Sequence, residues 1–260
     1  MDDCQENKGE KALIRGVETH YKVLGQGRAV LVLHGWGASP DSWQSVQEIL
    51  SGQGFKVICP DFPGFGQSET PTRAWSLNDY LAWLIEFIDF LKLEKPIVVG
   101  HSFGGRVAIR LSVAHPDIIN KLILIGSAGI KPELSLKQAM ILKMAKLGRT
   151  LFPSEKLRSA ARRVFYSFLR HKDYVNAKPV MRKTMQNVLA EDLSSLLPQI
   201  QTETLLVWGE KDRMVPLQFA RIFAKEIKGS ELKIIPGVGH SPQREVPQQT
   251  AAIILEFLKP

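Results

Sequence analysis

The chain has 260 residues, of which 44% are hydrophobic and 23% charged, an ordinary balance for a globular protein, and the length suits one large α/β domain or two small ones. The first ten residues are acidic and lack an apolar leader core, and no apolar run approaches membrane-spanning length, so we expect a cytoplasmic chain without a transmembrane segment. Two cysteines, Cys4 and Cys59, do not support a disulfide framework or a metal cluster.

The net charge of +8 is concentrated in one segment. Residues 127–195 contain 14 Lys or Arg against 5 Asp or Glu, whereas the rest of the chain contains 20 against 21. This distribution predicts a neutral body with one basic segment, and it argues against a nucleic-acid-binding protein.

The first half of the chain alternates between strand and helix patterns. Residues 11–24 alternate loosely, as in a short antiparallel pair, and the apolar run at 29–33 is typical of a strand buried on both faces. Further strands are predicted at 55–59, 95–99 and 122–125, with helices between them at 41–50, 76–91 (N-capped by Ser76) and 103–114. The right-handed crossover rule folds this order into a parallel sheet covered by helices.

This alternation stops between residues 127 and 195 and then resumes. The segment contains only amphipathic helical patterns, at about 134–147, 154–170 and 178–190. Strands at 204–208 and 231–235 and helices at 216–227 and 248–258 follow. We therefore predict a doubly wound, mostly parallel sheet of about eight strands, with residues 1–126 and 196–260 as the core and 127–195 as a helical cap.

Ser102 lies in the motif Gly100-His-Ser-Phe-Gly104, between a predicted strand and a predicted helix. A serine at such a sharp turn adopts a strained backbone, and the residues two before and two after it have no room for side chains. The helix N-terminus would stabilise negative charge developing on a bound carbonyl. The pattern predicts a nucleophile, and the alternative is a glycine-rich turn with a solvent-facing serine.

A serine nucleophile needs a base and an acid, and both follow predicted strands. Asp212 comes after the strand at 204–208 and His240 after the strand at 231–235. Residues at the carboxyl ends of parallel strands share one site. Asp212 could instead cap a turn, and Asp61, Glu210 and Glu245 compete for the acid role.

The chain resembles the α/β-hydrolase family. Ser102, Asp212 and His240 follow the family's order of nucleophile, acid and base, and matching motifs occur over nearly the full length. The matching motifs are His34-Gly-Trp-Gly37, the loop 61–68, Gly100-His-Ser-Phe-Gly-Gly105, Gly209-x-x-Asp-x-x-x-Pro216 and Gly239-His240. The resemblance implies a catalytic triad of Ser102, Asp212 and His240, with an oxyanion hole made by the backbone N–H groups of Trp36 and Phe103. His34 and His101 are then structural or pocket residues, and no cofactor or metal is expected.

The leading interpretation is a serine hydrolase that cleaves an ester or related acyl bond of a small, partly apolar molecule. One alternative is a carbon–carbon bond hydrolase, although such relatives usually have a longer glycine-rich, proline-containing segment in place of His34-Gly-Trp-Gly37. A cofactor-free lyase with the same triad would use arginines such as Arg106 to hold carboxylates. A perhydrolase is a further alternative, and so is a ligand-sensing protein on the hydrolase scaffold.

The basic cap has three interpretations. Its Lys and Arg side chains could form solvated helix faces, attract an anionic substrate into the cleft, or adsorb to an anionic membrane surface, the last being disfavoured. The expected partner is a small-molecule substrate, while the sequence leaves the substrate's identity and the oligomeric state open.

Overall fold

All the strands expected from the apolar runs are present in the computed structural model, which describes residues 9–131 and 178–259. They are β1 (Glu10–Ile14), β2 (Val17–Leu24), β3 (Arg28–Leu33), β4 (Phe55–Pro60), β5 (Ile97–His101), β6 (Leu122–Ile125), β7 (Thr204–Gly209) and β8 (Glu231–Ile235). The α-helices are α1 (Gln44–Gly52), α2 (Leu77–Phe90), α3 (Phe103–Ala114), α7 (Pro179–Ala190), α8 (Leu217–Glu226), α9 (Pro242–Glu245) and α10 (Pro247–Leu258). Short 3₁₀ turns occupy Pro40–Trp43, Pro116–Ile118 and Ser194–Gln199.

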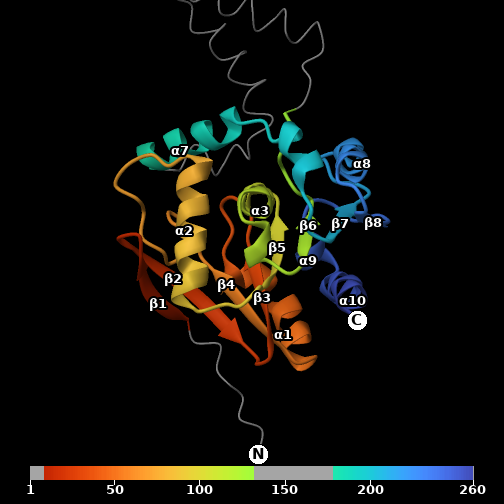
Figure 1. Cartoon of the computed structure of the whole chain (residues 1–260), viewed down its shortest axis with the longest axis horizontal. Coiled ribbons are helices and arrows are strands. Elements are labelled where there is room, and N and C mark those ends of the chain that lie inside the picture. Colours follow the sequence, from red (N-terminus) through yellow and green to blue (C-terminus); the bar gives the residue numbers. More distant parts are fainter. Residues whose placement is uncertain (1–8, 132–177, 260) are drawn as a thin grey trace, which may run out of the picture.

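The eight strands form one sheet in the order β1-β2-β4-β3-β5-β6-β7-β8. β1 and β2 are antiparallel to each other and β2 is antiparallel to β4, whereas all pairs from β4 to β8 are parallel. The fold is therefore the predicted mostly parallel α/β sheet (Figure 1). The carboxyl ends of β3, β5, β6, β7 and β8 consequently open at one edge, where a ligand site is expected.

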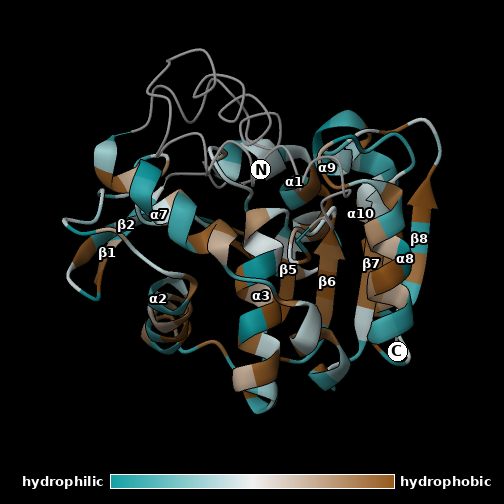
Figure 2. Ribbon diagram, turned by 90° about the horizontal axis from the view of Figure 1, so that it is seen from above, coloured by the Kyte–Doolittle hydropathy of each residue, from teal (hydrophilic) through white to brown (hydrophobic). Residues whose placement is uncertain are grey.

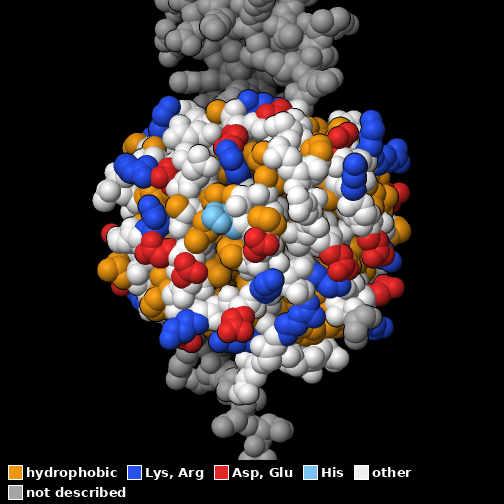
Figure 3. Space-filling view, in the orientation of Figure 1, with side chains coloured by type: hydrophobic (Ala, Val, Ile, Leu, Met, Phe, Trp, Pro, Cys, Tyr) orange, Lys and Arg blue, Asp and Glu red, His pale blue; other side chains and the backbone are white. Residues whose placement is uncertain are grey.

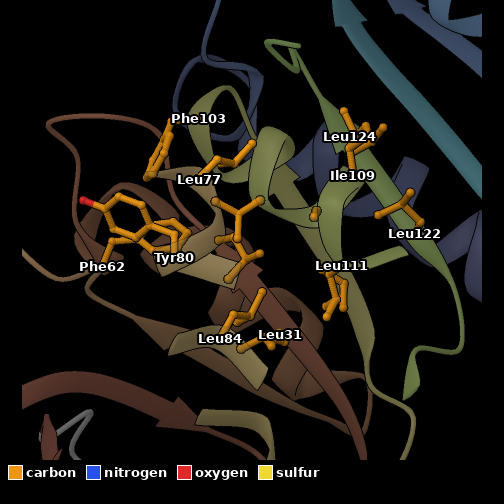
Figure 4. Close-up of a cluster of buried hydrophobic side chains, with 14 of the residues drawn as sticks. Leu31, Phe62, Leu77, Tyr80, Leu84, Phe103, Ile109, Leu111, Leu122 and Leu124 are labelled. Atoms are coloured by element: carbon orange, nitrogen blue, oxygen red, sulfur yellow. The ribbon is translucent and has the colours of Figure 1, made fainter. Parts of the chain in front are cut away.

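The core has two layers because side chains alternate across the buried strands. In β3, Leu31 and Leu33 face one layer, which α2, α3 and α8 complete. Val30 and Val32 face the other layer, which is completed by α1 and α10. Figure 2 shows helices on both sides of the central strands, and Figure 4 shows part of the first layer, to which Leu31, Tyr80, Leu84 and Phe103 belong.

Helix α2 begins where its sequence predicts. The Ser76 hydroxyl accepts a hydrogen bond from the Asp79 N–H, and the Asp79 carboxylate accepts one from the Ser76 N–H. This reciprocal capping box is a purely local signal, which is why the start of the helix could be read from the sequence.

Of the three helices predicted between 127 and 195, the structure describes the third, as α7. The helices expected at 134–147 and 154–170 lie outside the described residues, as do ten of the fourteen basic side chains. α7 lies across the N-terminal end of α2 (Figure 1), where the Thr184 hydroxyl accepts from the Trp75 N–H at 2.9 Å and the Asn187 amide donates to the Trp75 carbonyl at 3.2 Å. Elsewhere, basic and acidic side chains are interspersed over the face seen in Figure 3. The boundaries of the cap stay a prediction.

Candidate active site

Ser102 stands at the turn between β5 and α3 in a strained backbone conformation, with φ +52° and ψ −109°. Positive φ is uncommon for residues other than glycine, and it turns the side chain away from both flanking elements. A Cβ atom at Gly100 would lie 2.7 Å from the Gly105 Cα, and one at Gly104 would lie 2.1 Å from the Leu33 carbonyl oxygen. The turn therefore requires glycine at both positions, as the motif predicted.

We expect Gly104→Ala to destabilise the protein by about 3 kcal/mol, because the added methyl group would clash with backbone atoms of Leu33 and His34 that cannot rotate away. Gly52→Ala is the matched control, since a Cβ there meets nothing within 4 Å and the residue is helical. The control should change stability by no more than about 1 kcal/mol. Urea denaturation measures both, and equal effects of the two substitutions would contradict the close packing of the turn.

Asp212 and His240 come together across the ends of β7 and β8. The His240 Nδ1–H donates to Asp212 Oδ2 at 2.8 Å, and Asp212 Oδ1 accepts from the N–H groups of Met214 and Val215, each at 2.8 Å. The carboxylate is buried, with 5% of the residue exposed. Because Asp212 occupies Nδ1, the Nε2 atom of His240 is left to act as the acceptor of a proton.

This pair lies beside the serine turn. The imidazole of His101, the residue before Ser102, donates from Nε2 to the His240 carbonyl at 2.8 Å, and the two rings are 4.9 Å apart. A Cβ at Gly126, at the end of β6, would lie 3.3 Å from Asp212 Oδ2 and 3.4 Å from His240 Nδ1. The structure thus gathers Ser102, Asp212 and His240 at the carboxyl edge of the sheet.

The competing carboxylates have other partners. Glu210 accepts from the Gly237 N–H, and Glu245 accepts from the Gly239 N–H. Asp61 accepts from the His20 Nδ1–H at 2.8 Å and from the Gln67 N–H, so it anchors the loop 61–68. His20 is only 3% exposed, because that loop folds back over β2. Such a tertiary contact leaves no local pattern in the sequence.

The turn after β3 packs directly against the serine turn. A Cβ at Gly35 would lie 3.4 Å from the Ser102 Cβ. The His34 Nδ1–H donates to the Gly35 carbonyl at 2.8 Å, and His34 Nε2 accepts from the Phe62 N–H at 3.0 Å, so His34 is a neutral structural residue. Burial lowers the pKa of His34, in keeping with that neutral form. Trp36 follows in this turn, and Phe103 begins α3.

An aromatic cluster lines this side of the site. The Trp36 ring lies 5.3 Å from Phe103 and 4.8 Å from Phe65, and Phe103 lies 5.0 Å from Tyr80. Phe62 packs on Phe103 at 4.9 Å. The sequence showed a glycine-rich loop at 61–68 but not that its two phenylalanines join Trp36 and Phe103. An apolar cluster therefore lies beside the serine turn, on the side of Trp36 and Phe103.

Arg106, the arginine named for the lyase alternative, is bound by main-chain groups of the protein itself. Its guanidinium is buried and donates to the main-chain carbonyls of Val188 (2.8 Å) and Glu191, at the C-terminal end of α7. Burial lowers the pKa of Arg106 to about 10, a value at which it is still charged at neutral pH. The favourable contact between a cation and a helix C-terminus holds α7 onto α3.

Three further observations concern metal binding, membrane-spanning helices and the cysteine Cys59. Across residues 9–131 and 178–259, no three His, Cys, Asp or Glu side chains gather closely enough to hold a metal ion. Within the same ranges, none of the helices is long and apolar enough to cross a membrane. Cys59 is a free thiol buried in β4, and burial raises its pKa, so it is an inert core residue.

Comparisons with known proteins agree with this fold. A 2-hydroxy-6-oxo-6-(2'-aminophenyl)hexa-2,4-dienoic acid hydrolase from Metapseudomonas resinovorans is 30% identical, with 94% of this chain and 88% of the relative covered. A 2-hydroxymuconate semialdehyde hydrolase from Pseudomonas putida is 29% identical, with 96% and 94% covered.

Solved structures extend these similarities. A serine hydrolase involved in carbazole degradation superimposes with a TM-score of 0.73 at 27% identity, covering 96% of this chain and 98% of that one. An esterase from Exiguobacterium antarcticum gives a TM-score of 0.77 at 22% identity, covering 97% and 100%, and so shares the fold. The model of the alpha/beta hydrolase family matches residues 30–253. With most of its length matched in this way, the chain belongs to the alpha/beta hydrolase family.

Proposed function

We propose that the chain is a serine hydrolase that cleaves an ester or related acyl bond of a small, partly apolar molecule, with Ser102 as nucleophile. The observation that carries the proposal is the 2.8 Å hydrogen bond between His240 and a fully partnered, buried Asp212, next to a serine held in a strained turn. A free serine hydroxyl is a poor nucleophile at neutral pH, and this arrangement is the one that activates it.

In the proposed reaction His240 Nε2 takes the proton of the Ser102 hydroxyl as Oγ bonds to the carbonyl carbon of the substrate. The negative charge that develops on the carbonyl oxygen is stabilised by the N–H groups of Trp36 and Phe103. The bond to the leaving alcohol then breaks, and His240 protonates that alcohol. Water, deprotonated by His240, attacks the acyl-enzyme, releases the acid and restores Ser102, while Asp212 keeps the imidazole oriented throughout.

The aromatic cluster supports the apolar part of this substrate class. Trp36 and Phe65 are only partly buried and pack on Phe103, whose backbone N–H is a proposed oxyanion donor. Apolar walls beside an oxyanion site bind the hydrocarbon part of an ester and keep water from the reacting atoms.

A second candidate is hydrolysis of a carbon–carbon bond, which the named relatives favour. The curated relatives quoted above are named for 2-hydroxy-6-oxo-dienoic acid and 2-hydroxymuconate semialdehyde substrates. Such molecules contain carbonyl and carboxylate groups but no ester, so their hydrolysis breaks a carbon–carbon bond. The same serine, base and oxyanion donors serve either reaction.

One assay panel separates the two candidates. Purified protein is given p-nitrophenyl esters of graded acyl length, anionic esters, and a 2-hydroxy-6-oxo-hexadienoate whose visible absorbance is lost on cleavage. We expect turnover of short, apolar esters. If kcat/KM for the dienoate exceeded that for every ester by about 100-fold or more, a margin of nearly 3 kcal/mol in transition-state binding, the carbon–carbon reaction would replace the ester proposal.

A further inference from the structure

The loop between β8 and α9 carries His240, and its first part is held by the two residues that follow β7. The Lys211 N–H donates to the Val238 carbonyl at 2.8 Å, and the Gly237 N–H donates to the Glu210 carboxylate at 2.9 Å. These contacts hold the part of the loop that precedes His240.

The main chain at His240 itself is held by two side chains. Glu245 accepts from the N–H groups on both sides of the histidine, from Gly239 to Oε2 at 2.8 Å and from Ser241 to Oε1 at 3.1 Å. The His240 carbonyl accepts from His101 Nε2. The Glu245 carboxylate therefore bridges the two backbone amides that flank His240, the proposed base.

Glu245 is well placed for this because its own backbone is tied to the same loop. It ends the single-turn helix α9, and its N–H donates to the Ser241 carbonyl at 3.0 Å. A Cβ at Gly239 would lie 3.0 Å from Glu245 Oε1, so glycine there lets the carboxylate approach closely. Hydrogen bonds to an ionised carboxylate are roughly twice as strong as neutral ones.

We propose that Glu245 is a positioning residue for His240, an inference that rests on the proposed role of His240 as the base. Asp212 fixes the ring at Nδ1, but a ring fixed at one atom can still swing if its backbone moves. By holding the amides of Gly239 and Ser241, Glu245 fixes the Cα of His240, so that Nε2 stays directed at Ser102. Displacement of a catalytic group by about 1 Å can cost up to 100-fold in rate.

The test uses covalent labelling of Ser102 by a fluorophosphonate, which does not require the natural substrate. Glu245→Ala is expected to lower the maximal labelling rate constant about tenfold, while the concentration for half-maximal rate changes less than about twofold. Glu245→Gln keeps one acceptor oxygen and should lie between the alanine variant and the unchanged protein. Glu210→Ala is the matched control, because the Glu210 and Glu245 side chains are both exposed and each binds a backbone amide of the same loop. The labelling rate of Glu210→Ala should stay within about twofold of that of the unchanged protein.

The outcomes separate this inference from the proposed function. Equal losses in the Glu245→Ala and Glu210→Ala variants would mean general loosening of the loop and would overturn the positioning role, as would an unchanged rate in Glu245→Ala. In either case, loss of labelling in Ser102→Ala would leave the proposed function standing. If Ser102→Ala were labelled as fast as the unchanged protein, the proposed function itself would fail.

Discussion

Replacing Ser102 with alanine is expected to lower kcat on a short p-nitrophenyl ester by on the order of 10⁴-fold or more. The substitution removes the atom that forms the acyl-enzyme, and the oxyanion donors alone give only a small part of the acceleration. Alanine bears the same backbone strain at φ +52° as serine, so the turn should still form. Steady-state kinetics and fluorophosphonate labelling measure the effect.

A serine further along α3 provides the control for this prediction. Ser112 is buried, and its hydroxyl donates to the Ile109 carbonyl within the helix, so Ser112→Ala should keep nearly full activity. Full turnover by Ser102→Ala would contradict the nucleophile assignment and favour a binding or sensing role for the scaffold.

Replacing Asp212 with asparagine is expected to lower kcat by about 10⁴-fold, the size of the loss when the acid of a serine protease triad is changed in the same way. An asparagine oxygen can still accept from the Met214 and Val215 amides, so the loop should be kept. Its NH₂ group would face His240 Nδ1 and favour the tautomer with the proton on Nε2, which cannot accept the proton of Ser102.

The kinetic comparison for Asp212 uses the other carboxylates at this edge. Glu210→Gln and Asp61→Asn alter carboxylates that bind Gly237 and His20 rather than His240, so neither should approach the loss in Asp212→Asn. A larger loss in either of them, with Asp212→Asn close to full activity, would assign the acid to a different residue. Thermal unfolding of each variant checks that all of them remain folded.

The order of strands and helices could be predicted from the sequence because the signals are local. Apolar runs of four to six residues mark strands buried on both faces, such as β3 and β6, and the Ser76 cap marks the start of α2. α9 was not predicted, because a single turn is too short to show a helical period. The requirement for glycine on both sides of Ser102 was predicted correctly, because it follows from the close approach of backbone atoms at the turn itself.

The roles of Ser102, Asp212 and His240 were inferred from the sequence alone, because parallel strands bring their carboxyl ends together wherever the residues lie along the chain. Only the tertiary structure decided which partners the surrounding side chains take: Asp61 accepts from His20, Arg106 donates to the end of α7, and Glu245 accepts from the amides on both sides of His240. Such contacts depend on how elements are placed in space, whether those elements are far apart in the sequence or joined by one short turn. A hydrogen-bond partner chosen by packing leaves no periodic trace in the residue order, so it becomes visible only when the chain is folded.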